Sequence, residues 1–161
     1  CPACKPIAFH PHEENPMIRP LIVLAALVLA VPASARDDRN LYPLDDALKS
    51  PNAQAKLDSG VALYFAGQKH PGVAKTMGEF RTNKKTNAVN KSDKEACEWV
   101  FLAAMLELQE RARKEGGNAV IDIVSNYKNI ETRSATQYMC GNGAIMAGVA
   151  FKGTVVKTSG K

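Results

Sequence analysis

One segment, Asp93–Glu115, has the sequence of a long helix and constrains the fold more than any other. Ser92 and Glu95 form the S-x-x-E pattern that satisfies backbone donors at a helix start. Gly116-Gly117 follows where a helix would stop. Eight consecutive apolar residues, Trp99–Leu106, cover its first half nearly all round, which predicts packing against a sheet. The expected i,i+4 ion pairs are Glu107 with Arg111 and Glu110 with Lys114.

Four further segments have the sequence of strands. Val61–Ala66 is a short apolar and aromatic run between two glycines, and Asn118–Val124 is a β-branched run directly after the helix. Val73–Thr82 places apolar residues among polar ones, and the glycine-rich segment Tyr138–Val156 is expected to be a long strand or a hairpin. Together with the helix, these segments predict an α+β fold, with one long helix packed on a small mixed or antiparallel sheet of about four to five strands.

The remaining segments are expected to lie outside regular structure. Arg36–Gly60 shows neither a sustained helical nor a strand periodicity and is interpreted as an N-terminal leader, in which Asp45–Leu57 could hold a helical turn or two interrupted by Pro51. The single folded domain would then comprise residues 61–157. Arg81–Asn87 is interpreted as a basic, turn-rich connection that is solvated or, in the alternative, contacts phosphate or lipid head groups. Asn126–Gln137 is expected to be a polar loop.

The segment Met17–Ala35 has the sequence of a secretory signal peptide. Arg19 precedes the eleven-residue apolar run Leu21–Val31, and small residues at positions 33–35 suit a signal peptidase. The mature protein is then expected to begin at Arg36 and to be soluble in the periplasm of a Gram-negative type of cell. The alternative is a membrane anchor, although the apolar run is short for a spanning helix.

Residues 1–16 contain four side chains that bind metals elsewhere. Cys1, Cys4, His10 and His12 would together suit zinc. The segment begins with a cysteine and precedes a complete signal peptide, so it is interpreted as an upstream extension that is not in the mature protein. No functional zinc site is predicted there.

Two cysteines, Cys97 and Cys140, remain after processing. In an oxidising exported compartment such a pair favours a disulfide over a metal or redox site. The bridge would join residues separated by 43 positions. The alternative is a thiolate and imidazole metal site that adds His70, the only histidine after residue 35.

Charge and missing motifs exclude several functions. Removing residues 1–35 takes away two bases and two acids, so the net charge stays at +5. This charge suits an anionic envelope surface, whereas export contradicts a nucleic-acid partner. The chain lacks the G-x-x-x-x-G-K-[ST] and G-x-S-x-G patterns, so no nucleotide, cofactor or catalytic residue is predicted. Asp122, inside a predicted strand, is interpreted as facing solvent and not as a site residue.

Several segments resemble a family of small exported proteobacterial proteins. The resemblance rests on Ala96-Cys97, Ala112–Val120, Tyr138–Gly141 and Gly143-Ala144, and it covers roughly Gly72–Val156. Proteins of this family often bear the label excinuclease ATPase subunit, which the missing phosphate loop and the export signal contradict. The chain is more distantly similar to the Rcs outer-membrane stress-sensor lipoprotein domain, and to a family of small pentameric domains described as heavy-metal-binding.

The resemblance implies an envelope-associated protein. Cys97 and Cys140 match the first and last of four cysteines in the stress-sensor domain, where two disulfides form and these two do not pair with each other. This chain lacks the middle two cysteines and a lipid-anchor cysteine. We expect a non-enzymatic periplasmic domain that contacts an envelope protein or an anionic envelope surface, with no membrane span after processing. The alternative is a periplasmic protein that binds a small ligand or a heavy metal; an enzyme of unrecognised type is a third hypothesis.

Overall fold

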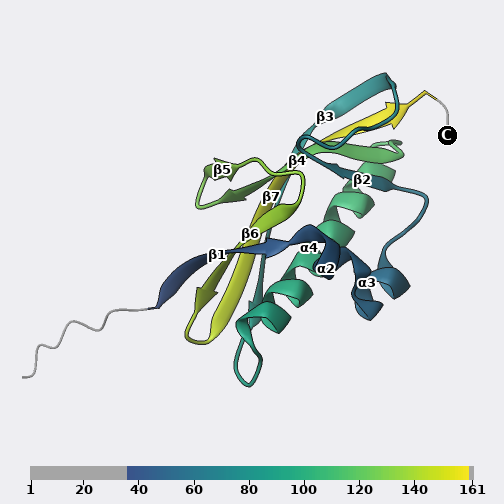
Figure 1. Ribbon diagram of the computed structural model, residues 1–161. Coiled ribbons are helices and arrows are strands. Elements are labelled where there is room, and N and C mark those ends of the chain that lie inside the picture. The colour runs from purple at the N-terminus through teal and green to yellow at the C-terminus, as the bar shows by residue number, and fades with distance from the viewer. Residues whose placement is uncertain (1–35, 160–161) are drawn as a thin grey trace, which may run out of the picture. The chain divides into compact units, whose positions relative to one another are not determined.

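A mixed sheet of seven strands, with one long helix across one of its faces, forms the fold (Figure 1). The computed structural model describes residues 36–159, and these lie within one compact unit. In chain order the elements are β1 (Asp37–Pro43), α2 (Leu44–Lys49), α3 (Pro51–Lys56), β2 (Ala62–Phe65), β3 (Val73–Asn87), α4 (Asp93–Lys114), β4 (Ala119–Tyr127), β5 (Ile130–Thr132), β6 (Gln137–Gly143) and β7 (Met146–Thr158).

Strand β7 organises the sheet. One of its edges pairs antiparallel with β3, from Met146 opposite Asn87 to Thr158 opposite Val73. Its other edge is shared, because β6 pairs near its start and β4 pairs with its second half. Strand β1 pairs with β6 and β5 with β4, both antiparallel, while β2 pairs with β4 in parallel. The parallel pair makes the sheet mixed.

The expected α+β fold with four to five strands is wrong. The sheet has seven strands, and 47% of the described residues lie in strands against 27% in helices. The two strands that the sequence did not predict, β1 and β5, are polar. Their formation depends on hydrogen bonding to β6 and β4, which no local hydrophobic pattern records.

Three segments expected to be a leader, a connection and a loop are ordered parts of this fold. Residues 36–60, interpreted as a leader, form β1, α2 and α3 and bury Leu44, Ala47 and Ala53, so they belong to the packed domain. The basic segment Arg81–Asn87 is the second half of β3 and not a connection. Within the expected loop Asn126–Gln137, β5 forms the return strand of a hairpin.

Helix α4 begins and ends within one residue of its predicted bounds. The Ser92 hydroxyl accepts a hydrogen bond from the backbone N–H of Glu95 at 3.1 Å. At the other end Gly116 adopts a φ of 77°, and the Gly117 N–H donates to the Ala112 carbonyl at 2.8 Å. This is the hydrogen-bond pattern of a Schellman stop, which a glycine at the left-handed position allows at no steric cost.

One of the two ion pairs predicted along α4 forms. Lys114 lies 2.8 Å from Glu110, whereas Glu107 does not pair with Arg111. Instead the Glu107 carboxylate binds Lys84 of β3 at 2.9 Å. The Glu107 carboxylate therefore forms its ion pair with the sheet and not with a residue of its own helix.

The core lies between α4 and the sheet. Phe101 occupies its centre, with ring centroids 4.5 Å from Tyr138, 5.7 Å from Phe151 and 6.1 Å from Phe65. The helix contacts β3 and β7 most extensively. Its apolar run is not covered all round, because Trp99 stays 43% exposed on the face away from the sheet.

We expect Tyr138→Phe to raise the free energy of unfolding by about 1 kcal/mol. Tyr138 is buried, and its hydroxyl has no hydrogen-bond partner among residues 36–159. This burial raises the pKa of Tyr138. Urea unfolding checks the prediction, with Tyr42→Phe as control. The Tyr42 hydroxyl donates to Asn142 at 3.3 Å, so its loss should destabilise the fold. A Tyr138→Phe protein less stable than wild type would contradict the prediction.

The predicted signal peptide, residues 17–35, and the upstream segment with Cys1, Cys4, His10 and His12 lie outside the described residues. None of the helices between residues 36 and 159 combines the length and apolar character that a membrane span requires.

Candidate functional site

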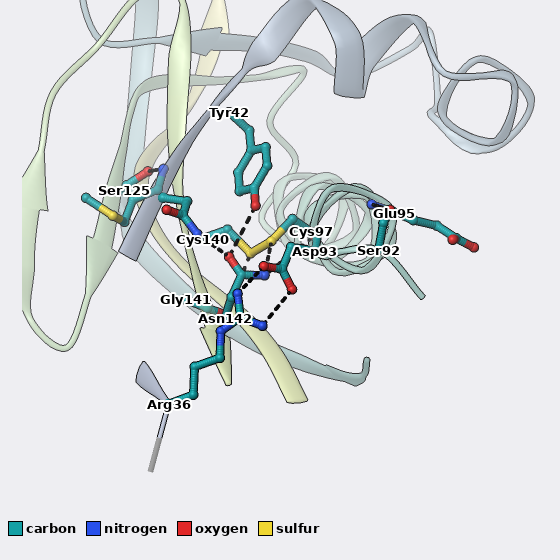
Figure 2. Close-up of a disulfide and its surroundings, with 12 residues drawn as sticks. Arg36, Tyr42, Ser92, Asp93, Glu95, Cys97, Ser125, Cys140, Gly141 and Asn142 are labelled. Atoms are coloured by element: carbon teal, nitrogen blue, oxygen red, sulfur yellow. Dashed lines mark hydrogen bonds and ion pairs between the residues drawn. A yellow bond between two sulfur atoms is a disulfide. The ribbon is translucent and has the colours of Figure 1, made fainter. Parts of the chain in front are cut away.

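The structure confirms the predicted disulfide between Cys97 and Cys140 (Figure 2). It joins the first turns of α4 to β6, with Cα atoms 6.0 Å apart, and both cysteines are fully buried. The bridge thus fastens the helix to the sheet at one end of the core. A disulfide in this position has a structural role, because solvent reductants cannot reach it without opening the fold.

Asn142 completes the surroundings of the disulfide. Its side-chain nitrogen lies 3.2 Å from the Cys97 sulfur and 3.5 Å from the Asp93 carbonyl oxygen. Its side-chain oxygen accepts from Asn40 at 3.1 Å and from Tyr42 at 3.3 Å. One buried amide therefore connects β1, β6 and the start of α4, and its donors and acceptor are all engaged.

An ion pair holds the beginning of the described chain against the same end of α4. The Arg36 guanidinium binds the Asp93 carboxylate through two nitrogens (Figure 2). It also binds Asp38 at 2.6 Å. The hydrogen bond to Asp93 raises the pKa of Arg36 above its usual value. Asp93 is the first residue of α4, where a carboxylate also interacts favourably with the helix dipole.

His70 does not join the cysteines. It is exposed between β2 and β3, and its ring lies 5.9 Å from that of Tyr64. No group of three His, Cys, Asp or Glu side chains within residues 36–159 could hold a metal ion. In this oxidised form both thiolates needed by the alternative metal site are bonded to each other.

Strand β3 separates its side chains onto two faces of the sheet. Phe80 lies under the Arg111 guanidinium at 5.0 Å, and both Thr82 and Lys84 bind the Glu107 carboxylate, so these three residues face α4. Successive side chains of a strand point to opposite faces. The residues between them therefore point away from the helix.

Those intervening residues, Arg81, Asn83 and Lys85, form one wall of an open depression that we call the sheet groove. The opposite wall is the β4–β5 hairpin. Two adjoining halves of about 220 and 240 Å³ share Asn83. The first half is lined by Arg81, Thr82, Asn83, Asn126, Lys128, Asn129 and Ala150, and the second by Asp37, Asn83, Lys85, Tyr127, Gly141, Gly143, Met146, Ala147 and Gly148.

Small residues make the floor of the sheet groove. A Cβ on Gly141 would overlap the Tyr127 ring, and one on Gly148 would come within 4.0 Å of that ring. Ala150 continues this floor toward the other half. The glycines thus let Tyr127 lie close to the sheet, so that the groove stays open beside it.

Positive charge predominates along the walls. Lys128 forms an ion pair with Asp37, and its hydrogen bond holds the pKa of Asp37 below the usual range. Arg81 lies 3.9 Å from Glu79, a long contact for an ion pair. Lys85 has no ion-pair partner within the described part of the chain. Arg81 and Lys85 therefore remain available to an anionic ligand.

The turn of the β4–β5 hairpin fixes Lys128 above the groove. Lys128 and Asn129 both adopt left-handed backbone conformations, with φ values of 53° and 62°. This is the form of a two-residue hairpin turn, in which asparagine is favoured and lysine costs about 1 kcal/mol. The Lys128 ammonium lies 5.8 Å from the centre of the Tyr127 ring.

Sequence reasoning found the cysteines but not the groove. Asp122 is exposed as expected and pairs with Arg133. It therefore takes no part in the surroundings of the disulfide or in the sheet groove. The sequence pattern predicts a connection at Arg81, Asn83 and Lys85, whereas they lie in β3. All residues of Arg81–Asn87 are polar, so this part of the sequence carries no apolar–polar alternation that would mark a strand or distinguish its two faces.

Neither the protein-family models nor the curated proteins contain a match to this chain. Its function is therefore argued from the geometry of the disulfide cluster and of the sheet groove.

Proposed function

We propose that this protein is an exported, disulfide-stabilised binding domain of the bacterial periplasm, which uses the sheet groove to bind an acidic, extended segment of an envelope protein. The observation that carries the proposal is the exposure of Arg81 and Lys85 beside a floor of small residues. The proposal makes the domain a binding module and not an enzyme, in agreement with the envelope role that the sequence resemblance implies.

Two features support export. Residues 17–35 have the signal-peptide pattern, and the disulfide is of the kind that persists in oxidising compartments. Strand β1 begins at Asp37, the second residue after the expected cleavage site. Removal of the preceding residues would therefore leave β1 intact.

The shape of the groove favours a chain over a small molecule. Pockets for small ligands enclose most of the ligand's surface, whereas both halves of the groove are open to solvent along their length. Its amide side chains, Asn83, Asn126 and Asn129, offer both donors and acceptors, which suit the amides of a peptide backbone. The cations beside them would select carboxylate side chains.

Titration of the exported protein with a fluorescent octaglutamate peptide tests this function. We expect binding that weakens as salt is added, and about tenfold weaker binding by the double variant Arg81→Gln/Lys85→Gln at low ionic strength. The matched control is Lys75→Gln/Lys157→Gln. These two lysines face each other across β3 and β7 at the other end of the strands, so their loss changes the net charge equally.

The control variant should bind the peptide as the wild type does. Equal weakening by both double variants would show that only net charge matters and would contradict a groove site. Failure of the wild-type protein to bind the peptide at low salt would do the same.

A further inference from the structure

Strand β3 leaves one long edge of the sheet unpaired. It pairs with β7 on one side only, and from Glu79 to Asn87 this register runs without a bulge. Among residues 36–159, the backbone groups between Glu79 and Thr86 form hydrogen bonds with no element other than β7. In an antiparallel strand the backbone groups of alternate residues point to opposite edges, so residues 79–87 present a row of unpaired donors and acceptors. We call this row the β3 edge.

The edge strand β2 shows what a closed edge looks like in this protein. The Phe65 N–H donates to the side-chain oxygen of Gln68 at 2.9 Å. Just before the strand, the Val61 carbonyl accepts from the side-chain nitrogen of Gln109 at 2.8 Å. Strand β2 is also only four residues long, which limits pairing with another chain. The β3 edge is longer and has no such side-chain caps, so it is the edge that an added strand can use.

We propose that the β3 edge accepts a β-strand of a partner protein in which acidic residues occupy every second position. Arg81 and Lys85 point to the face away from α4, so carboxylates on that face of an added strand would lie beside them. Arg81 has only a long contact with Glu79, at 3.9 Å, and Lys85 is unpaired among residues 36–159. On the opposite face Lys84 is already paired with Glu107, so the intervening positions of the strand need no charge.

An acidic strand fits this edge better than a second copy of the chain. Antiparallel pairing of two copies over all of residues 79–87 would place Arg81 of each copy directly opposite Lys85 of the other. Like charges in directly opposite positions destabilise a strand pair, whereas opposite charges stabilise it. The cations therefore protect the β3 edge from self-association and attract an acidic partner. The inference does not depend on the proposed function, because an added strand lies beside β3 and not in the sheet groove.

Amide hydrogen exchange of the exported protein, followed by NMR, tests the inference with the alternating peptide Glu-Thr-Glu-Thr-Glu-Thr-Glu-Thr as the probe. In the free protein, alternate amides of the β3 edge should exchange as rapidly as other exposed amides. With an excess of peptide we expect their exchange to slow about tenfold or more, because each becomes hydrogen-bonded to the added strand. The outward amides of β1, which pairs only with β6, are the internal control and should not change.

The matched control peptide has the same composition, with all its glutamates before all its threonines. It should bind about tenfold more weakly, since only the alternating order puts every carboxylate on one face of a strand. Equal or tighter binding of the control peptide would overturn the inference. A free protein that is dimeric, with the amides of the β3 edge already protected, would identify a second copy as the occupant and also overturn it. A protein that binds octaglutamate, but in which the alternating peptide protects no amide of the β3 edge, would overturn this inference and leave the proposed function standing.

Discussion

Removal of the Cys97–Cys140 disulfide is expected to lower the free energy of unfolding by about 4 kcal/mol. The bridge closes a loop of 43 residues, which restricts the unfolded chain far more than the folded one. It also secures the start of α4 against β6, where both sulfur atoms are buried. Since domains of this size are stable by about 5–15 kcal/mol, the loss would be a large fraction of the total.

Urea unfolding of the double variant Cys97→Ala/Cys140→Ala measures this loss. The wild-type protein, unfolded in the presence of a thiol reductant, provides a second measurement without a cavity at the two positions. Reductant should lower the stability of the wild type and leave that of the variant unchanged. A variant within 1 kcal/mol of the oxidised wild type, about the typical effect of a single mutation, would contradict the prediction.

The same bridge provides a test of export. After secretion into the periplasm, we expect a chain that begins at Arg36 and has no titratable thiol. A form expressed without residues 1–35 in the cytosol should show two free thiols and the lower stability of the reduced protein. An intact precursor in the cytosol with both thiols free would contradict export and remove the compartment on which the proposed function depends.

The parts of this fold that the sequence predicts are those with strong local signals. The Ser92 cap, the glycines at 116–117 and the apolar run between them define α4 almost to the residue. The apolar strands β2, β4 and β7 are recognisable for the same reason. The cysteine pair is predictable from its count and compartment, since few alternatives exist for two cysteines in an exported domain.

The parts that the sequence does not predict depend on neighbours distant in the chain. Strand β1 is polar and is held by pairing with β6, about a hundred residues later in the chain. The sheet groove depends on Tyr127 lying over Gly141, a contact that neither residue signals. Glu107 is predicted to form an ion pair within its own helix, but it forms one with a lysine of β3 instead. Tertiary contacts thus determine the conformation and the partners of residues whose local preferences are weak.

Asn142→Ala is expected to lower the free energy of unfolding by about 3 kcal/mol, the second-largest effect we predict. The Asn142 side chain is 1% exposed and makes its hydrogen bonds to β1, to the start of α4 and to the disulfide. Its removal leaves the Tyr42 hydroxyl without its partner and opens a cavity beside Cys97. Unpaired buried groups cost more than the net value of the hydrogen bonds they lose.

Urea unfolding again provides the measurement, with Asn83→Ala as the matched control. Asn83 is an exposed asparagine on β3, so its replacement should change stability by less than about 0.5 kcal/mol. The effects of Asn142→Ala and Tyr42→Phe should not add, because both remove the same hydrogen bond. Strict additivity, or an Asn142→Ala protein as stable as the control, would show that this amide does not join β1 to the disulfide.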